Sequence, residues 1–407
     1  MTNELINEII NLRDNKTRME KYMENFDILK EWSIVIFNDN KKKIGIPDYL
    51  KTKTISKNFF NYSPYPTSDF LVFNADSVQA YFDNRTYQYR ISGAIELDTN
   101  ILSYLSSFIE NGNEEFKEIF DYLIEPEHNS TINAYLNEND QFIYSKYDKI
   151  EKKIKAYEII KNFDYENYVL NNNVKSYLDE ESLKKQVNIS MEYFRIRQIF
   201  LRLINKNMFD LIYCELLLMI VIEYSYQKNS LPFKLEKFIS ECAGKLGFIP
   251  SREIAIAKKY YLNELKFFDS IQKNNKNVFK KLESMTWDLF HVHYTENAVL
   301  FANISDCDLY FPSFLTRDKK LFDALKDYVL DSYAYNSVTK EVISFCDIKK
   351  IVFPNKNIRL TKAEQKDLMK IYRRLKESKY VVQNDGVDYE SLKCELKNEV
   401  KDLLNIF

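Results

Sequence analysis

Two aspartates stand directly after apolar, strand-like runs and before helical patterns, where a carboxylate can bind a ligand. Asp98 follows the run over residues 91–97, and Asp318 follows the run over residues 309–316. In a parallel α/β sheet, ligands bind at the carboxyl ends of the strands, so both side chains are candidates for a binding site. The alternative for each is a plain helix N-cap, a role that aspartate fills well.

A third acid lies in apolar surroundings. Glu215 interrupts the apolar run over residues 211–222, and its neighbours at helical spacing are Leu211, Leu218 and Met219. A buried carboxylate without a partner is costly, so Glu215 needs a cation, a bound metal or a shifted pKa. The alternative is a buried ion pair with a nearby arginine.

A fourth acid, Asp288, is expected in the first turn of a helix over residues 287–304, where the helix dipole favours a negative charge. His291 follows one turn later on roughly the same face, whereas His293 points elsewhere. The spacing Asp-x-x-His is compatible with a metal-binding pair. The alternative is a hydrogen-bonded structural histidine on a half-buried helix.

The elements that must position these acids alternate between strand and helix patterns. We expect an amphipathic helix over 1–30 and strands over 32–37, 70–73, 78–82, 86–90 and 91–97. Further helices are expected over 100–110, 190–228, 234–245, 251–270 and 287–304. A strand at 309–316 and a helix from 318 to about 333 precede a mostly helical tail, which has a short strand candidate at 350–353.

The composition argues against several other kinds of site. Glycine accounts for only 6 of 407 residues, and the chain has neither a G-x-G-x-x-G nor a complete Walker A motif, which disfavours dinucleotide and P-loop sites. The 5 cysteines include no C-x-x-C pair, so neither a disulfide framework nor a zinc ribbon is expected. The net charge of -2 means that any anion-binding surface must be local. A signal-peptide pattern and a membrane-spanning run are both absent from the sequence, which favours a cytoplasmic protein.

The order of these features resembles the PIN-domain nuclease family. The most specific pieces are Asp98-Thr-Asn-Ile-Leu and Phe-Leu-Thr316-Arg-Asp318-Lys-Lys-Leu-Phe, with Asp288-x-x-His291 between them. The resemblance implies an α/β fold, a parallel sheet flanked by helices. It also implies three or four clustered carboxylates that bind Mg²⁺ or Mn²⁺ and hydrolyse single-stranded RNA. Asp98, Asp288 and Asp318 match the family pattern well, and Glu215 matches it less closely.

The resemblance covers about residues 91–112 and 190–330. It divides the chain into an N-terminal α/β accessory region over 1–90, a PIN-like nuclease core over 91–330 and a helical C-terminal region over 331–407. A helical insertion at about 113–190 separates Asp98 from Glu215 much further than in compact members of the family. Glu125 and Glu138 are therefore alternatives for the second acid.

The implied chemistry is phosphodiester hydrolysis by a carboxylate-held metal site. Oxygen ligands suit Mg²⁺ and Mn²⁺, and clustered carboxylates without metal should hold at least one proton, because like charges repel. Hydrogen-bonding residues that could orient water or phosphate are Thr99, Asn100 and Thr316. Basic residues that could contact the substrate are Arg195, Arg202 and Lys319. The alternative is that the basic residues only form solvated helix faces.

The sequence therefore predicts a metal-dependent endoribonuclease, which the family association connects with toxins and phage-defence effectors. One alternative is an interaction protein that keeps the fold without cleaving and binds a protein partner or a second copy of itself. Another is a structure-specific DNA nuclease with a related carboxylate cluster.

Overall fold

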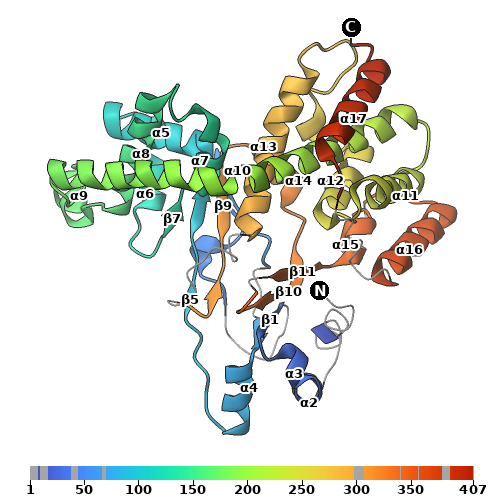
Figure 1. Ribbon diagram of the computed structural model, residues 1–407, viewed down its shortest axis with the longest axis horizontal. Coiled ribbons are helices and arrows are strands. Elements are labelled where there is room, and N and C mark those ends of the chain that lie inside the picture. The colour runs from blue at the N-terminus through green and yellow to red at the C-terminus, as the bar shows by residue number, and fades with distance from the viewer. Residues whose placement is uncertain are drawn as a thin grey trace.

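The computed structural model shows a mixed α/β protein in which helices predominate (Figure 1). It describes residues 8–9, 17–37, 45–66, 70–297, 307–339, 341–355, 357–377 and 386–406, with only the backbone described at 198–200 and 377. The expected α/β class is confirmed. Within the described ranges, the strands form three sheets.

The central sheet contains the strands that precede Asp98 and Asp318. Its strands, in the order β2-β3-β9-β6-β7, are β2 (Lys53–Ser56), β3 (Phe59–Tyr62), β9 (Ser313–Thr316), β6 (Ile95–Leu97) and β7 (Ser130–Thr131). β6 runs parallel to β7 and β9, as expected for strands joined by helical crossovers. The sheet as a whole is mixed rather than parallel, because the tight hairpin β2-β3 adds to the β9 edge in antiparallel orientation.

A second, antiparallel sheet brings together segments from both ends of the chain. Its strands, in the order β11-β10-β1-β4, are β11 (Val342–Cys346), β10 (Leu330–Asn336), β1 (Trp32–Phe37) and β4 (Phe70–Phe73). The sequence pattern predicted β1 and β4, whereas β10 and β11 lie in a segment that was expected to be mostly helical. A short parallel pair, β5 (Ile91–Ser92) with β8 (Leu309–Tyr310), forms the third sheet.

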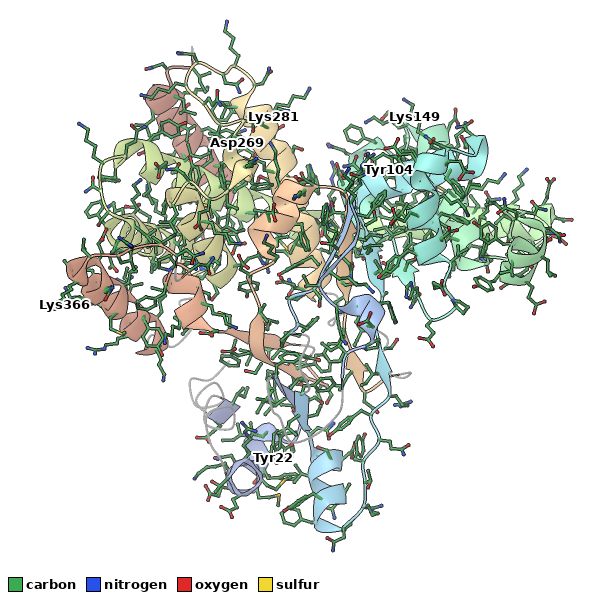
Figure 2. All side chains as sticks on the ribbon, turned by 180° about the vertical axis from the view of Figure 1, so that it is seen from behind. Tyr22, Tyr104, Lys149, Asp269, Lys281 and Lys366 are labelled. Carbon is green, nitrogen blue, oxygen red and sulfur yellow. The ribbon has the colours of Figure 1, made fainter. Side chains whose placement is uncertain are left out.

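The long helix α10 (Glu180–Ser225) crosses the molecule and joins two groups of helices (Figure 1). The first group, to the left in Figure 1, comprises α5 (Thr99–Asn111), α6 (Lys117–Leu123), α7 (Asn133–Glu138), α8 (Tyr147–Lys161) and α9 (Tyr165–Asn171). The second comprises α11 (Leu231–Glu241), α12 (Ser251–Tyr261), α13 (Val278–Asn297), α14 (Lys319–Leu325), α15 (Ile348–Val352), α16 (Lys362–Glu377) and α17 (Tyr389–Leu404). Figure 2 shows both groups from behind, with Tyr104 on the first and Lys281 on the second. Although α10 has 46 residues, the described part of the chain contains no helix with the length and apolarity needed to cross a membrane.

Three short helices pack at the antiparallel sheet, which lies low in Figure 1: α2 (Arg18–Glu24), α3 (Phe26–Leu29) and α4 (Ala75–Phe82). Single turns of helix complete the fold at η1 (Asp48–Leu50), η2 (Glu114–Phe116), η3 (Asp140–Phe142), η4 (Cys242–Leu246) and η5 (Lys266–Phe268). A large apolar core extends from the central sheet into both helix groups. It fixes the strand ends relative to α13, which the site requires.

Several expected elements differ from the structure because local capping outweighs the apolar pattern. The strand expected at 78–82 is part of α4, which begins with a capping box between Asn74 and Ser77. The strand expected at 350–353 overlaps α15, where Asp347 caps the helix. No strand is present at 86–90. Of the helix expected over 1–30, residues 1–7 and 10–16 lie outside the described residues, as do residues 298–304 of the helix expected over 287–304.

Candidate metal centre

The parallel strands β7, β6 and β9 end at the same edge of the central sheet. Leu97 lies opposite Leu315 in the β6–β9 register, so Asp98 and Thr316 follow side by side. From β6 the chain crosses to β7 on one side, and it later enters β9 on the other side. Sheets of this kind generally bind ligands at the strand ends where the direction of winding changes.

Thr316 connects the two strand-end aspartates. Its hydroxyl donates a hydrogen bond to Oδ2 of Asp98 at 2.9 Å and accepts one from the backbone N–H of Asp318 at 3.0 Å. Asp98 is only 4% exposed. Burial raises the pKa of Asp98, although His291 and the Thr316 hydroxyl oppose this shift. The Asp98 carboxylate is thus held in one orientation beside β9.

Asp318 is an N-cap and also a member of the site. Its Oδ1 accepts hydrogen bonds from the backbone N–H groups of Lys320 at 2.7 Å and Leu321 at 3.1 Å, at the start of α14. The capping alternative is therefore correct for this oxygen. Oδ2 accepts no hydrogen bond from any residue that the structure describes, so it remains free for a ligand.

Asp288 lies in the middle of α13, not in the first turn of a helix as expected, because α13 already begins at Val278. The dipole argument for its charge is therefore wrong. Burial and the charges of Asp98, Asp318 and Glu138 raise the pKa of Asp288 well above its ordinary value. Three other carboxylates thus lie within electrostatic range of Asp288.

Glu138 ends α7 and faces both Asp98 and α13. Its Oε2 accepts a hydrogen bond from the hydroxyl of Thr99 and lies 3.7 Å from Nε2 of His291. The sequence left Glu125 and Glu138 open as alternatives for the second acid. Glu125 instead lies by His128, near the end of α6, where it lines a different hollow. Glu138 is the one that joins the other acids.

Glu96, in the middle of β6, positions Glu138 and was missed by the sequence analysis. It is 2% exposed, and it accepts hydrogen bonds from the Thr131 hydroxyl at 2.9 Å and the Ala134 backbone N–H at 2.6 Å. These bonds attach the start of α7 to β6. The signal in the sequence was a charged residue inside an apolar strand, two residues before Asp98.

His291 is buried between these acids without a hydrogen-bond partner. It is 1% exposed, and neither ring nitrogen has a partner among the described residues. Burial lowers its pKa, and the charges of Glu138 and Asp98 oppose this shift. A neutral imidazole with free nitrogens, 3.7 Å from a carboxylate, is suited to binding a metal ion.

We call Asp98, Glu138, Asp288 and Asp318 the strand-end carboxylates. Glu215, which was expected to join three of them, lies elsewhere, beside Glu253 and His293. The apolar run around Glu215 correctly indicated burial, but it gave no information on which other elements would surround the side chain. The single group of four acids expected from the sequence is therefore divided between two places.

Glu215, Glu253 and His293 form a second group, which we call the helical acid group. It is drawn from α10, α12 and α13, and one potential ligand atom from each residue lies within 4.8 Å of the others. Nε2 of His293 lies 2.8 Å from Oε1 of Glu253. A buried cluster of this composition could hold a metal ion.

The two groups lie on different faces of α13. Asp288 and His293 are five residues apart, which corresponds to about 140° around a helix, whereas Asp288 and His291 are separated by about 60°. The first face of α13 contacts the strand ends through His291 and Asp288. The other face contacts α12 through His293. One helix thus contributes to both groups.

The predicted substrate-contacting residues are distributed unevenly. Thr99 and Thr316 bind carboxylates of the site directly. Asn100 and Lys319 are exposed, one position beyond Thr99 and Asp318 respectively. Arg195 is exposed and paired with Glu192 at 2.7 Å, so of these residues it has the least evident relation to the site.

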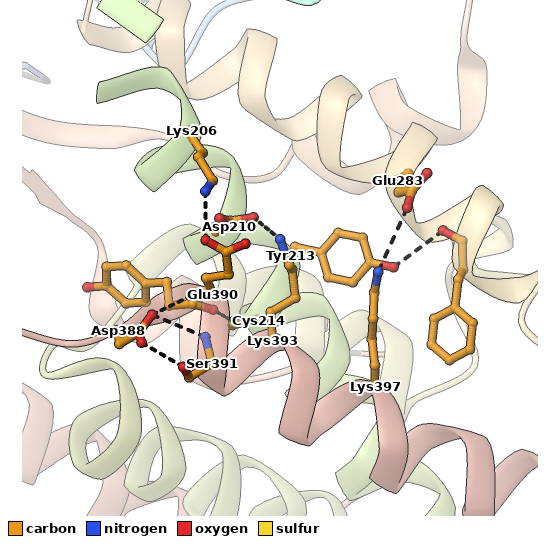
Figure 3. A network of polar contacts seen from close by, with 12 residues as sticks. Lys206, Asp210, Tyr213, Cys214, Glu283, Asp388, Glu390, Ser391, Lys393 and Lys397 are labelled. Atoms are coloured by element: carbon orange, nitrogen blue, oxygen red, sulfur yellow. Dashed lines mark hydrogen bonds and ion pairs between the residues drawn. The ribbon is translucent and has the colours of Figure 1, made fainter. Parts of the chain in front are cut away.

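Arg202 lines a groove of about 380 Å³ beside the strand-end carboxylates. The groove includes Asn137 and Trp287, the immediate chain neighbours of Glu138 and Asp288. Its outer part is formed where α17 docks on α10. Figure 3 shows the contacts there, including the ion pairs Lys206–Glu390 and Asp210–Lys393. The groove therefore has a mixed lining of three basic and three acidic side chains, and it adjoins the site through the chain neighbours of Glu138 and Asp288.

Lys153 of α8 is a further basic residue near the site that the sequence analysis missed. Burial lowers its pKa, while the charges of Glu138 and Asp98 raise it, so the ammonium group lies within range of both carboxylates. Its Nζ also lies 5.1 Å from the centre of the Tyr135 ring. In the sequence it was one of several lysines in a charged helix and had no distinguishing signal.

In comparisons with known proteins, no family model, no curated protein and no solved structure matches this chain. The resemblance to PIN-domain nucleases therefore depends on the residues and their order in the sequence alone.

Proposed function

We propose that the protein is a metal-dependent nuclease that hydrolyses single-stranded RNA at the strand-end carboxylates, in a PIN-like core. The observation that carries the proposal is that Asp98, Glu138 and Asp318 lie within electrostatic range of Asp288, whose pKa is raised by burial and by their charges, and that His291, buried without a hydrogen-bond partner among the described residues, lies 3.7 Å from Glu138. Such a group is costly unless a cation neutralises it. Perturbed acids at the ends of parallel strands favour a functional site over a structural one.

The donor atoms fit Mg²⁺ or Mn²⁺. Carboxylate oxygens suit both ions, and an imidazole nitrogen from His291 would favour Mn²⁺ over Mg²⁺. Asp288 accepts no hydrogen bond from the described residues, and one oxygen of Asp318 is also free. These two acids and Glu138 are partly exposed, so a substrate can reach them.

The residues of the site have separable roles in this reaction. Thr316 fixes the Asp98 carboxylate, and Thr99 fixes that of Glu138, so that both are oriented before substrate binds. A bound divalent cation supplies charge neutralisation at the phosphate and lowers the pKa of a water molecule. Lys153 adds a positive charge near Glu138 and Asp98, where it can stabilise the negative charge that develops on the phosphate.

The groove supports a single-stranded substrate. Arg202 and Lys393 can contact phosphates, and Phe209 and Trp287, whose ring centres are 4.7 Å apart, offer an aromatic surface for unpaired bases. Of the predicted phosphate contacts, Arg202 therefore has the strongest support. Unpaired bases can stack in this way in RNA and in single-stranded DNA, so the sugar must be distinguished by experiment.

A cleavage assay tests the proposal. End-labelled single-stranded RNA, single-stranded DNA and flap DNA are incubated with the full chain in Mg²⁺, Mn²⁺ or excess chelator. We expect internal cleavage of RNA that requires the metal and is lost in Asp98→Asn. The exposed glutamate in Glu181→Gln provides a matched control, which should cut like the parent.

Two other results would replace the proposal. Metal-dependent cleavage of only the DNA substrates would replace the proposal with a DNA nuclease. If no substrate is cut and calorimetry detects no Mn²⁺ binding that Asp98→Asn weakens, the protein is a non-cleaving interaction protein.

A further inference from the structure

The helical acid group has an unusual buried carboxylate. Glu215 is 1% exposed, and neither of its oxygens has a hydrogen-bond partner among the described residues. Both oxygens lie in a core formed by α10, α12 and α13, next to Glu253, which is also 1% exposed. A buried carboxylate with no hydrogen bond is strongly destabilising unless it is protonated or bound to a cation.

The neighbouring arginine does not satisfy this group. Arg252 uses Nη2 to pair with Glu296, while its Nε and Nη1 have no hydrogen-bond partner in the part of the chain that the structure describes, and Nη1 lies 3.8 Å from Oε1 of Glu253. Arg252 and Glu296 cancel each other in charge. Glu215 and Glu253 remain, and with a neutral His293 they leave two negative charges in the core. This is the charge of one divalent cation.

We propose that Glu215, Glu253 and His293 bind one divalent transition-metal ion, with Zn²⁺ as the best match, and that this ion ties α10, α12 and α13 together. Two carboxylates and one imidazole, from three helices and within 4.8 Å of one another, form a three-residue N/O donor set. Zn²⁺ readily accepts such a set with a water as fourth ligand, whereas the imidazole nitrogen disfavours Mg²⁺ and Ca²⁺.

The site is structural rather than catalytic. Both glutamates are 1% exposed, and the His293 side chain is 22% exposed, so the ion can enter but a polymer cannot reach it. The inference does not depend on nuclease activity.

The test measures zinc retention and thermal unfolding of the full chain. The protein is stripped with a chelator, supplied with ZnCl₂, desalted and assayed for metal content. We expect the parent to keep one zinc per chain and to unfold at a higher temperature than its stripped form. Glu215→Gln and His293→Gln should lose the zinc and the temperature shift, since removal of a ligand weakens binding by more than about tenfold. Asp288→Asn and the exposed control Glu181→Gln should keep both.

Two results would overturn the inference. One is a stripped parent that takes up no zinc at this site. The other is a folded Glu215→Gln variant that binds zinc as tightly as the parent. If Glu215→Gln does not fold, His293→Gln decides, because its side chain is partly exposed. If neither variant folds, a His291→Gln protein is loaded with Mn²⁺, and magnetic coupling between the bound ion and a histidine nitrogen is measured. Absence of coupling rejects the site. Coupling supports the site, since His128 is then the single histidine in the chain besides His293.

Discussion

The strand-end carboxylates and the helical acid group contain the same kinds of side chain, and α13 contributes to both, yet their surroundings differ. Three of the four strand-end acids are partly exposed, and two threonine hydroxyls orient the group. The helical acid group is enclosed, and Glu215 has no hydrogen bond among the described residues. Access to substrate and oriented hydrogen bonds favour chemistry in the first group, whereas burial in the second favours a static role.

The sharpest test of this difference exchanges one carboxylate for its amide in each group. We expect Asp288→Asn to lower metal-dependent cleavage at least about 100-fold, the scale of removing one electrostatic group from an active site. Glu215→Gln, compared under conditions in which both variants are folded, should keep most of the parent's kcat. Single-turnover cleavage rates provide the measurement. Equal losses in both variants would mean that the two groups act as one.

The second acid can be distinguished in the same assay. Glu138→Gln should lose activity nearly as strongly as Asp288→Asn, because its carboxylate contacts Thr99 and lies 3.7 Å from His291. Glu125→Gln should behave like the parent, since Glu125 lies in a separate hollow near His128. A strong effect of Glu125→Gln with none for Glu138→Gln would reverse the assignment.

The sequence predicted those parts of the site that have a local signal. Asp98 and Asp318 follow apolar strands and precede helices, and Thr316 lies two residues before Asp318, so the β6–β9 edge could be predicted from short segments. Glu138 could not be chosen over Glu125, because β7 has only two residues and gives no recognisable strand pattern. The choice between Glu138 and Glu125 depends on the register between distant strands, which short segments of the sequence do not reveal.

Glu215 shows the opposite limitation. Its apolar neighbours at helical spacing correctly indicated that it is buried. The other two members of its group lie 38 and 78 positions further along the chain, on α12 and α13. Tertiary packing alone brings these helices together, and no pattern within a window of the sequence records it. For the same reason, the family resemblance grouped Glu215 with Asp98, Asp288 and Asp318, whereas its neighbours are Glu253 and His293.

The groove offers a smaller effect that separates binding from chemistry. We expect Arg202→Gln to raise KM by about tenfold or less with little change in kcat, because Arg202 lines the groove, whereas the described lining of the groove includes none of the strand-end carboxylates. The dependence of affinity on salt should become shallower, by about 0.7 in the logarithmic slope for one lost phosphate contact. Arg85→Gln is the control, since Arg85 is an exposed arginine paired with Asp83. An unchanged KM and salt slope would remove the groove from the substrate path.

The smallest expected effect concerns stability without metal. Asp98 and Asp288 have raised pKa values in the folded chain, so the native state holds protons that the unfolded chain releases at about pH 4. The stabilisation from these protons is present at low pH and is lost as pH rises towards the raised values.

In excess chelator, Asp288→Asn should therefore be more stable than the parent at pH 8, by about 1 kcal/mol, and the advantage should shrink at pH 5. Thermal unfolding scans at the two pH values measure this, with the exposed Asp27→Asn as control. Added Mn²⁺ should reverse the order, because the parent then has a cation to neutralise the strand-end carboxylates. Glu215→Gln, which keeps these four carboxylates, should be stabilised by Mn²⁺ bound there as the parent is.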